Sequence, residues 1–414
     1  MSIFNPLARP LRCLLCVVAL GAFGSTGARA DAVTEWNILD GELVTASGLI
    51  TQPASRVMAI AHTAAYEAAN AITKRYPGTA GIRLEAKADA SIEAAIAAAH
   101  RTALVRLLPT QQTAIEGAYA AALGKVDEGA AKSEGVAVGQ QAATLVLAAR
   151  ADDGASAAEA YRPITTAGTY VPTTIPAAPQ WPQRKTWLLT SASQFRPGPP
   201  PALTSERWAR DYNEIKAIGG RSSAVRSAEQ TEIAKFWETT RPPIYHGLVR
   251  SVAEMPGRDL MRNARLFAAV TQAIDDALIA VFDAKYHYGF WRPITAIRNG
   301  DIDANDATER DASWTPFIET PMHPEYPCAH CIQAATVGTV LQAEIGAGPT
   351  PTFTTTTGPT ANGAARRWTS VEALVQEVGN ARIYDGVHFR FSTEASIAMG
   401  RRIGALAAER FMLN

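Results

Sequence analysis

The sequence is poor in cysteine and in charged residues, and both shortages exclude classes of protein. Only four cysteines occur in 414 residues, and the two beyond residue 30, Cys328 and Cys331, cannot form a disulfide framework for a chain of this size. Only 19% of the residues are charged and the formal net charge is zero, so nothing in the composition indicates a nucleic-acid partner or an acidic partner. Hydrophobic residues make up 47% of the chain, which is enough for a sizeable core.

Long hydrophobic runs and nucleotide-binding motifs are also missing. No segment approaches the roughly 20 apolar residues that a transmembrane helix requires, so we expect no stable membrane span. The chain contains no GxGxxG, no GxxxxGK[ST] and no internal repeat. These absences argue against a dinucleotide site, a P-loop and a repeat architecture.

The first thirty residues differ from the rest of the chain. Arg9 and Arg12 precede an apolar run at residues 13–23, and residues 28–30 (Ala-Arg-Ala) have the small-x-small form of a cleavage site. We therefore predict a signal peptide at residues 1–30, cleaved near Ala30, and a periplasmic or secreted protein. A retained anchor is the alternative.

Apolar residues at helical spacing dominate the remainder and predict an all-α, multi-helix bundle. In the N-terminal helical part, residues 31–204, helices are expected at residues 53–73, 88–108, 110–123 and 130–149. In the C-terminal part, residues 205–414, they are expected at residues 205–218, 227–238, 257–286, 329–345, 366–383 and 389–412. Residues 300–327 and 346–363 are predicted loops. We favour one compact body over two independent domains.

A Pro-rich loop at residues 162–203 joins the two parts, with nine prolines between positions 163 and 201. It could be an interdomain linker. However, Trp181, Trp187 and Phe195 would be costly to leave in water. We therefore expect this segment to pack across the helices as an ordered loop.

Two sets of potential metal ligands are interpreted as structural. His62 is expected to be a satisfied core histidine, with metal binding as the alternative. Asp275, Asp276 and Asp283 have no ExxH partner on a second helix, so we expect them to neutralise nearby Arg or Lys side chains.

Three separated segments carry residues that suit a tetrahedral oxyanion, which requires fixed cations and free N–H groups. In the first, Lys285 and Arg292 are seven residues apart, or two helical turns. Gly289 and Pro293 predict a break in the helix that would swing Arg292 inward.

The second segment surrounds the start of the helix predicted at residues 329–345. Pro327 favours a first helical turn, whose N–H groups at Ala329 and His330 would point at an anion. His330 could also transfer protons.

In the third segment, Arg382 and His388 are six residues apart, on different sides of one continuous helix. Gly386 permits a sharp turn between them. Arg382 would then end one helix and His388 begin the next, so that both converge on one point.

The combination K-x6-R-P, P-x-x-H and R-x5-H, in this order, resembles the superfamily of vanadium-dependent haloperoxidases and type-2 phosphatidic acid phosphatases. Residues 288–298 (Tyr-Gly-Phe-Trp-Arg-Pro-Ile-Thr-Ala-Ile-Arg) and 387–391 (Val-His-Phe-Arg-Phe) are most similar to the soluble haloperoxidase branch. The resemblance is strong over about residues 270–410 and loose over the N-terminal helices.

This resemblance implies vanadate as the cofactor, with hydrogen peroxide and a halide as substrates. His388 would be the axial ligand of vanadium, His330 the acid/base, and Lys285 the residue that polarises bound peroxide. The residues implied to hold the oxygens of vanadate or phosphate are Lys285, Arg292, Cys328, Ala329 and Arg382. In an acid phosphatase, the same His388 would form a phosphohistidine with a phosphate ester.

Several positions depart from the family pattern. Cys328-Ala329 replaces Ser-Gly, so a thiol would replace a hydroxyl donor. Ala381 replaces a Ser, and Ser392 replaces the Asp that normally steadies the histidine. We therefore expect Ser392, Glu394 or a backbone carbonyl to orient His388.

Three other functions stay open from the residues. The first is the acid phosphatase of the same superfamily. The second is a thiol-disulfide oxidoreductase built on Cys328 and Cys331, because a CxxC at a helix N-terminus has a lowered thiol pKa; a redox gate on the oxyanion site is a related hypothesis. The third is an oxyanion-binding protein without catalysis.

Overall fold

The computed structural model describes residues 31–356 and 361–413, so the predicted signal peptide lies outside the described residues. Helices α1 to α5 span Ala32–Ala46, Thr51–Thr73, Ile92–Leu107, Gln112–Leu123 and Ala130–Ala149. Helices α6 to α10 span Glu206–Ile218, Ala228–Phe236, Pro242–Ala253, Leu260–Tyr288 and Pro293–Arg298. Helices α11 to α13 span Ala329–Ile345, Val371–Tyr384 and Arg390–Arg410. The predicted all-α fold is confirmed.

Short elements complete the chain. The 3-10 helices η1, η2 and η3 cover Pro109–Gln111, Trp181–Gln183 and Gly300–Ile302. Strands β1 (Phe353–Thr356) and β2 (Ala365–Trp368) form one antiparallel hairpin. None of the described helices combines the length and apolarity that crossing a bilayer requires.

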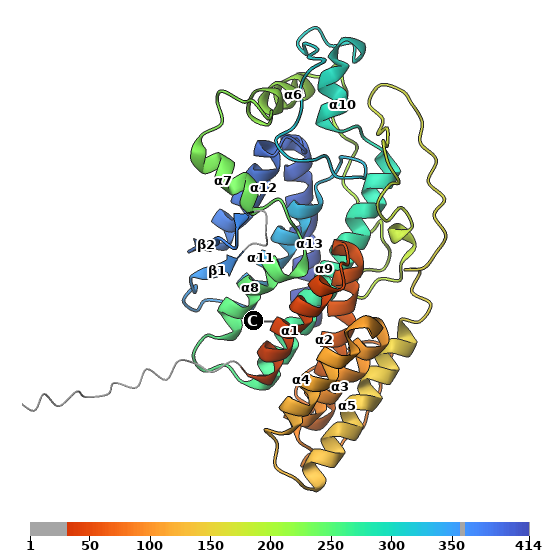
Figure 1. Ribbon diagram of the computed structural model, residues 1–414, viewed down its shortest axis with the longest axis vertical. Helices are drawn as coiled ribbons and strands as arrows, with labels where there is room; N and C mark the ends of the chain where they lie inside the picture. The colour runs from red at the N-terminus through yellow and green to blue at the C-terminus, as the bar shows by residue number, and fades with distance from the viewer. Residues whose placement is uncertain (1–30, 357–360, 414) are drawn as a thin grey trace, which may run out of the picture.

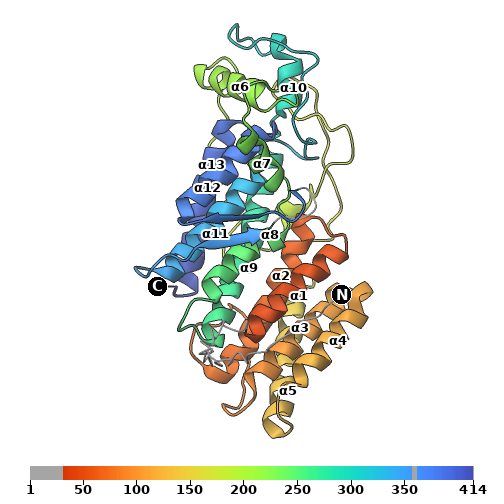
Figure 2. The same ribbon diagram turned by 60° about the vertical axis from the view of Figure 1, so that its left-hand side comes forward.

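Helix α9 is the central element of the molecule. It lies between α2 on one side and α11 and α13 on the other (Figures 1 and 2). Nearly every residue from Met261 to Lys285 is buried, as expected for a helix that is surrounded by other helices. One hydrophobic cluster extends from α1 through α9 to α13, so both predicted parts share a core.

Helices α1, α8 and α10 and the β1–β2 hairpin were not predicted, and the start of α12 was wrong. Helix α1 starts at Ala32 behind the N-cap Asp31, and α8 starts at Pro242 after an irregular stretch. The hairpin lies partly in the predicted loop at residues 346–363. Because Ala365–Trp368 pairs with Phe353–Thr356, α12 begins at Val371 and not at 366. Strand pairing across a loop depends on a nonlocal partner, which periodicity along one segment does not reveal.

The Pro-rich loop is ordered and packs along α9, as predicted. Trp181 is buried, and Arg184 forms ion pairs with Asp275 at 2.6 Å and with Asp153 at 2.7 Å. Arg196 pairs with Asp283 at 2.7 Å. These contacts fasten the segment to the middle and the end of α9.

Asp276 corrects one expectation about the acidic face of α9. Its carboxylate accepts backbone N–H groups from residues 187–189 at 2.7–2.9 Å and pairs with no Arg or Lys among the described residues. Burial raises its pKa to about 6, although the three N–H donors oppose this shift. The side chain therefore binds backbone donors of the loop.

Candidate active site at three helix junctions

The predicted basic residues lie at three junctions between helices. Helix α9 ends at Gly289, which has φ +56°, and α10 begins at Pro293, so Arg292 becomes the N-cap between them. Helix α12 ends at Tyr384 and α13 begins at Arg390, with Gly386 at φ +79° in the turn. These breaks confirm the predicted roles of Gly289 and Gly386.

The third junction is the start of α11, at Ala329. Its N-cap is Cys328, so Pro327 lies just before the cap and not in the first turn as predicted. The position of the helix start is nevertheless as expected. The N–H groups of a first turn have no intrahelical backbone acceptor, and two residues of this turn, Ala329 and His330, line the cavity.

Lys285 and Arg292 are completely buried and are held by backbone carbonyls. The Lys285 ammonium donates to the carbonyl oxygens of Pro324 and Glu325, both at 2.8 Å. Arg292 donates to the carbonyls of His323 at 2.8 Å and Val387 at 2.9 Å. These contacts bring the segment before α11 and the turn before α13 to the end of α9.

His388 lies beside Arg292 and is oriented by a carboxylate. Its Nδ1 is 2.8 Å from Oε1 of Glu325, and its Nε2 is 3.3 Å from Nη1 of Arg292. The Phe389 N–H also donates to Oε1 of Glu325, which fixes that carboxylate. With Nδ1 donating to the carboxylate, Nε2 carries the lone pair of the ring.

Arg382 offers unpaired donors at the same place. Its Nη1 donates to the carbonyl of Trp237 at 2.9 Å and to Asp385 at 2.6 Å. Its Nε and Nη2 are buried and have no hydrogen-bond partner within residues 31–356 and 361–413. A buried unpaired guanidinium N–H is costly, so these two donors are available to an anionic ligand.

His330 borders the cavity from the start of α11. Its Nε2 donates to the carbonyl of Glu238 at 3.2 Å, so Nδ1 carries the lone pair. Its own carbonyl accepts the Tyr245 hydroxyl at 3.1 Å. The imidazole is therefore fixed in one orientation and one tautomer.

The cavity itself has a volume of about 280 Å³. Four predicted site residues line it, namely Ala329, His330, Arg382 and His388. Lys285 and Arg292 lie behind this wall, where Arg292 contacts His388. Other parts of the wall come from Ile50–Gln52 at the start of α2 and from residues 238–241 between α7 and α8.

The site has an excess of buried positive charge. Burial lowers the pKa of Lys285 well below its usual value, and the nearby Arg292 lowers it further. Burial also lowers the pKa of His388, with Arg292 and Lys285 adding to the shift. The pKa of His330 falls for the same reason, with Arg382 as the main neighbouring charge. Both imidazoles are therefore neutral at neutral pH and can act as bases.

Glu325 was not predicted as a site residue, and one expectation about its surroundings needs correction. Glu394 pairs with Arg207 on the surface and does not orient His388. The Ser392 hydroxyl is 3.5 Å from Nδ1, which leaves Glu325 as the shorter contact. The replacement of the usual Asp by Ser392 was the available signal, because it implied that another carboxylate serves His388.

The predicted thiol donor of Cys328 is also corrected. Its sulfur is bonded to Cys331 in a disulfide, so it has no S–H to donate. The disulfide joins the N-cap of α11 to its first turn, and both residues are buried. Any oxyanion contact at this position would have to come from the backbone.

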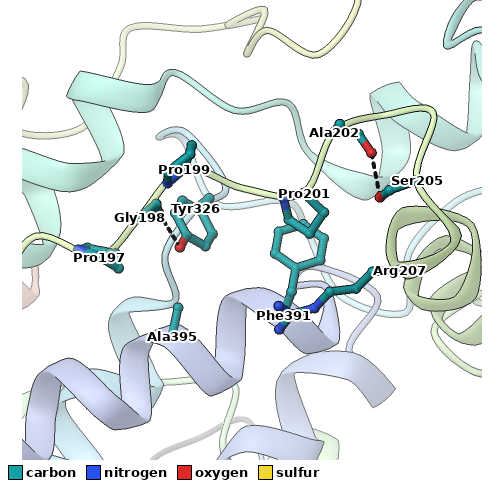
Figure 3. A pocket seen from close by; sticks show the side chains of 10 residues that line it. All are labelled: Pro197, Gly198, Pro199, Pro201, Ala202, Ser205, Arg207, Tyr326, Phe391 and Ala395. Atoms are coloured by element: carbon teal, nitrogen blue, oxygen red, sulfur yellow. Dashed lines mark hydrogen bonds between the residues drawn. The ribbon is translucent and has the colours of Figure 1, made fainter.

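A larger hollow, of about 520 Å³, lies between the Pro-rich loop and α13. Figure 3 shows its walls, with Pro197 to Pro201 on one side and Phe391 and Ala395 of α13 on the other. Tyr326 closes it by donating to the Gly198 carbonyl at 2.8 Å. Its one cation, Arg207, is already paired with Glu394 at 2.8 Å, so we do not assign the oxyanion site to this hollow.

Comparisons with known proteins identify similar sequences over the C-terminal part of the chain. A family model described as the VCPO second helical-bundle domain matches residues 265–413. The vanadium chloroperoxidase of Curvularia inaequalis is 28% identical over 172 aligned residues, which cover 34% of this chain and 28% of the length of that protein.

Solved structures share the fold over almost the whole chain. A bacterial vanadium-dependent iodoperoxidase superposes with a TM-score of 0.79 and 23% identity, over 92% of this chain and 95% of its own. A bacterial vanadium-dependent chloroperoxidase in its apo form superposes with a TM-score of 0.70 and 18% identity, over 86% of this chain and 92% of its own. A bacterial vanadium-dependent chloroperoxidase in its holo form superposes with a TM-score of 0.70 and 17% identity, over 94% of each chain.

Proposed function

Because the chain belongs to the superfamily of vanadium-dependent haloperoxidases and type-2 phosphatidic acid phosphatases, we propose that it is a vanadate-dependent haloperoxidase. Its substrates would be hydrogen peroxide and a halide. The observation that carries this proposal is Arg382, whose buried Nε and Nη2 have no partner beside the cavity that His388 lines. A tetrahedral oxyanion supplies the acceptors that these donors lack.

The residues present fit vanadate. Three buried cations, Lys285, Arg292 and Arg382, would balance its charge, and the N–H groups at the start of α11 would donate to its oxygens. The lone pair of His388 Nε2 would bind the vanadium. Cys328 would take part only through its backbone. When bound, vanadate supplies a Lewis acid that activates hydrogen peroxide toward a halide.

The protein's own contribution is orientation, charge and proton transfer. Glu325 holds His388 through Nδ1 and keeps its other nitrogen unprotonated. His330, neutral and fixed by the Glu238 carbonyl, would take a proton from entering peroxide through Nδ1. Lys285 would then polarise the bound substrate, and the buried wall would exclude competing water.

A phosphatase of the same superfamily is the alternative. The same unprotonated Nε2, next to three cations, suits a histidine nucleophile that attacks a phosphate ester. His330 would then protonate the leaving group. Both reactions use one site, so an assay must distinguish them.

The assay gives purified protein vanadate, hydrogen peroxide and bromide with a phenol-red acceptor, beside a phosphate-ester substrate. Vanadate-dependent bromination supports the haloperoxidase. Ester hydrolysis that vanadate inhibits supports the phosphatase. If neither occurs while vanadate binds, the protein is an oxyanion binder.

His388→Ala should lower the vanadate-dependent rate at least about 100-fold, because a buried group aimed at the reacting centre is lost. His287→Ala, an exposed histidine near the end of α9, is the matched control and should keep the wild-type rate. Circular dichroism checks that both variants fold. Full turnover by the His388 variant would refute the assignment of this residue.

Export with cleavage near Ala30 is part of the proposal. The Cys328–Cys331 disulfide supports it, since disulfides persist mainly in oxidising compartments. Intact-mass spectrometry of the protein from the periplasm or medium should give a chain that begins at Asp31. A full-length mass in the cytosol would contradict this.

A further inference from the structure

A second group of polar side chains, outside the proposed active site, is enclosed by α1, α2 and α3. Asp40 of α1, His62 of α2 and His100 of α3 each present a ligand atom, and the three atoms lie within 4.8 Å of one another. None of the three residues is more than 1% exposed. We propose that they bind one divalent transition-metal ion, with zinc as the best chemical match.

The spacing of the ligand atoms suits a metal ion. Oδ2 of Asp40 is 3.0 Å from Nδ1 of His100 and 3.5 Å from Nε2 of His62. Zinc binds nitrogen and oxygen ligands at about 2.0–2.2 Å, which separates tetrahedral ligand atoms by roughly 3.3–3.6 Å. Small adjustments would therefore bring all three atoms to bonding distance of a common centre.

The hydrogen bonding of this group is incomplete. Both carboxylate oxygens of Asp40 and both ring nitrogens of His100 are buried without a hydrogen-bond partner among the described residues. The 3.0 Å contact between Asp40 and His100 is short, yet it is not a hydrogen bond, because the two groups are not aligned for one. A cation between them would satisfy both.

The protonation of His62 points the same way. Arg250 donates to Oδ1 of Asn37 at 2.9 Å, which fixes the orientation of that amide. Its Nδ2 then faces Nε2 of His62 at 3.0 Å, so Nε2 must be unprotonated. The unprotonated Nε2 thus lies 3.5 Å from Oδ2 of Asp40, and a cation stabilises two such electron-rich atoms close together. A bound metal ion would replace Asn37 as the partner of this lone pair. The Asn37 amide would keep its contact with Nδ1 of His246.

Aromatic packing holds the two imidazole rings in place. His100 stacks on Trp36 with ring centres 5.1 Å apart, and His62 stacks on Phe267 at 5.2 Å. Two imidazoles and one carboxylate favour zinc over calcium or magnesium, which prefer oxygen ligands. Because the group is enclosed, we assign the metal a structural role, joining α1, α2 and α3.

Metal analysis tests this proposal directly. Tag-free mature protein is incubated with zinc, freed of unbound metal by gel filtration and analysed by mass spectrometry for zinc. We expect about one zinc per wild-type chain, and at least about tenfold less in Asp40→Asn, which removes a ligand charge at constant size. His287→Gln, which removes an exposed histidine, should retain the wild-type content.

A second measurement uses wild-type protein alone, so it does not depend on the folding of a variant. Cobalt-loaded protein should show the strong visible absorption of a four-coordinate site, in which water is the fourth ligand beside the three side chains, and a chelator should abolish it. Wild-type protein that retains no zinc and shows no such absorption would overturn the proposal and indicate a bridging water or a shared proton. Full zinc retention by a folded Asp40→Asn would also overturn it. Vanadium measured in the same samples reports separately on the proposed function.

Discussion

Glu325 and His388 come from segments 63 residues apart, and their contact at 2.8 Å determines which imidazole nitrogen is free. The carboxylate is itself fixed by the Phe389 N–H at 3.1 Å. Burial raises the pKa of Glu325 to about 7, with Lys285 and Arg292 opposing the shift. One acidic residue therefore connects the orientation of His388 to the charge of the whole site.

Glu325→Gln should lower vanadate affinity about 10- to 100-fold, the usual effect of losing a partner that orients a ligand. The amide oxygen can still accept from Nδ1 and from Phe389, but it is uncharged and makes His388 a weaker ligand. Equilibrium binding followed by vanadium content measures this change. His287→Ala, which removes an exposed histidine outside the site, is the control and should keep the wild-type affinity. Equal losses in both variants would contradict the role of Glu325.

Among single residues, the basic side chains of the site could be predicted from the sequence, whereas the residues that contact and orient them could not. Lys285, Arg292, Arg382 and His388 were identified because their spacing is a motif. Glu325 belongs to no such spacing relative to His388, and only the folded chain brings the two together. The disulfide between Cys328 and Cys331 was likewise not predictable, because a CxxC sequence alone does not show whether its two cysteines are oxidised.

At the scale of elements, α9 serves two purposes. Its C-terminal end carries Lys285, and its middle carries the aspartates that fasten the Pro-rich loop. The carboxylate of Asp276 replaces the missing secondary-structure partners of three consecutive N–H groups. The loop is therefore held by named hydrogen bonds as well as by apolar burial.

Asp276→Asn should destabilise the protein by about 1–3 kcal/mol, because an amide cannot accept all three N–H groups. The pKa of Asp276 is raised to about 6 in the folded state, above its unfolded value near 3.8. Between these values the folded protein holds more protons, so wild-type stability falls as pH rises from about 4 to 6. Asn does not titrate, so the free energy of unfolding of Asp276→Asn should lack this pH dependence. The difference in free energy of unfolding between the two proteins, measured by urea unfolding, should therefore shrink as pH rises over this range. A difference that grows with pH would contradict the shift.

Element prediction succeeded where one segment contains its own signal. Helices α2, α5, α6 and α11 were expected within a few residues of their bounds, because apolar periodicity and caps such as Ser205 are local. Helix α8 was not predicted, although its Pro242 and Pro243 are well tolerated in a first helical turn. The β1–β2 hairpin was missed because each strand requires the other.

At the scale of the whole molecule, the proposed site concentrates positive charge in the interior. Three cations, Lys285, Arg292 and Arg382, are at most 1% exposed. Glu325 and Asp385 oppose them only in part, since burial raises the pKa of each to about 7. Such a site stabilises the protein poorly by itself and is completed by an anion.

Vanadate should therefore raise the thermal stability of the protein. A ligand that binds only the folded state adds about 2.7 kcal/mol at 100 times its dissociation constant. Differential scanning calorimetry at increasing vanadate should show a rising midpoint. Arg382→Met, which removes the unpaired donors at similar length, should abolish most of the rise. An unchanged midpoint in wild-type protein would count against the anion site.

The cavity wall at Ile50–Gln52 belongs to the N-terminal half, whereas every predicted anion ligand lies in the C-terminal half. The rest of the wall, including residues 238–241, Ile318 and Glu319, lies in the C-terminal half, so among the described residues Ile50–Gln52 is the one contribution of the N-terminal half to this cavity. Substitutions at the start of α2 can reshape what reaches the reacting centre without disturbing the groups that perform the reaction.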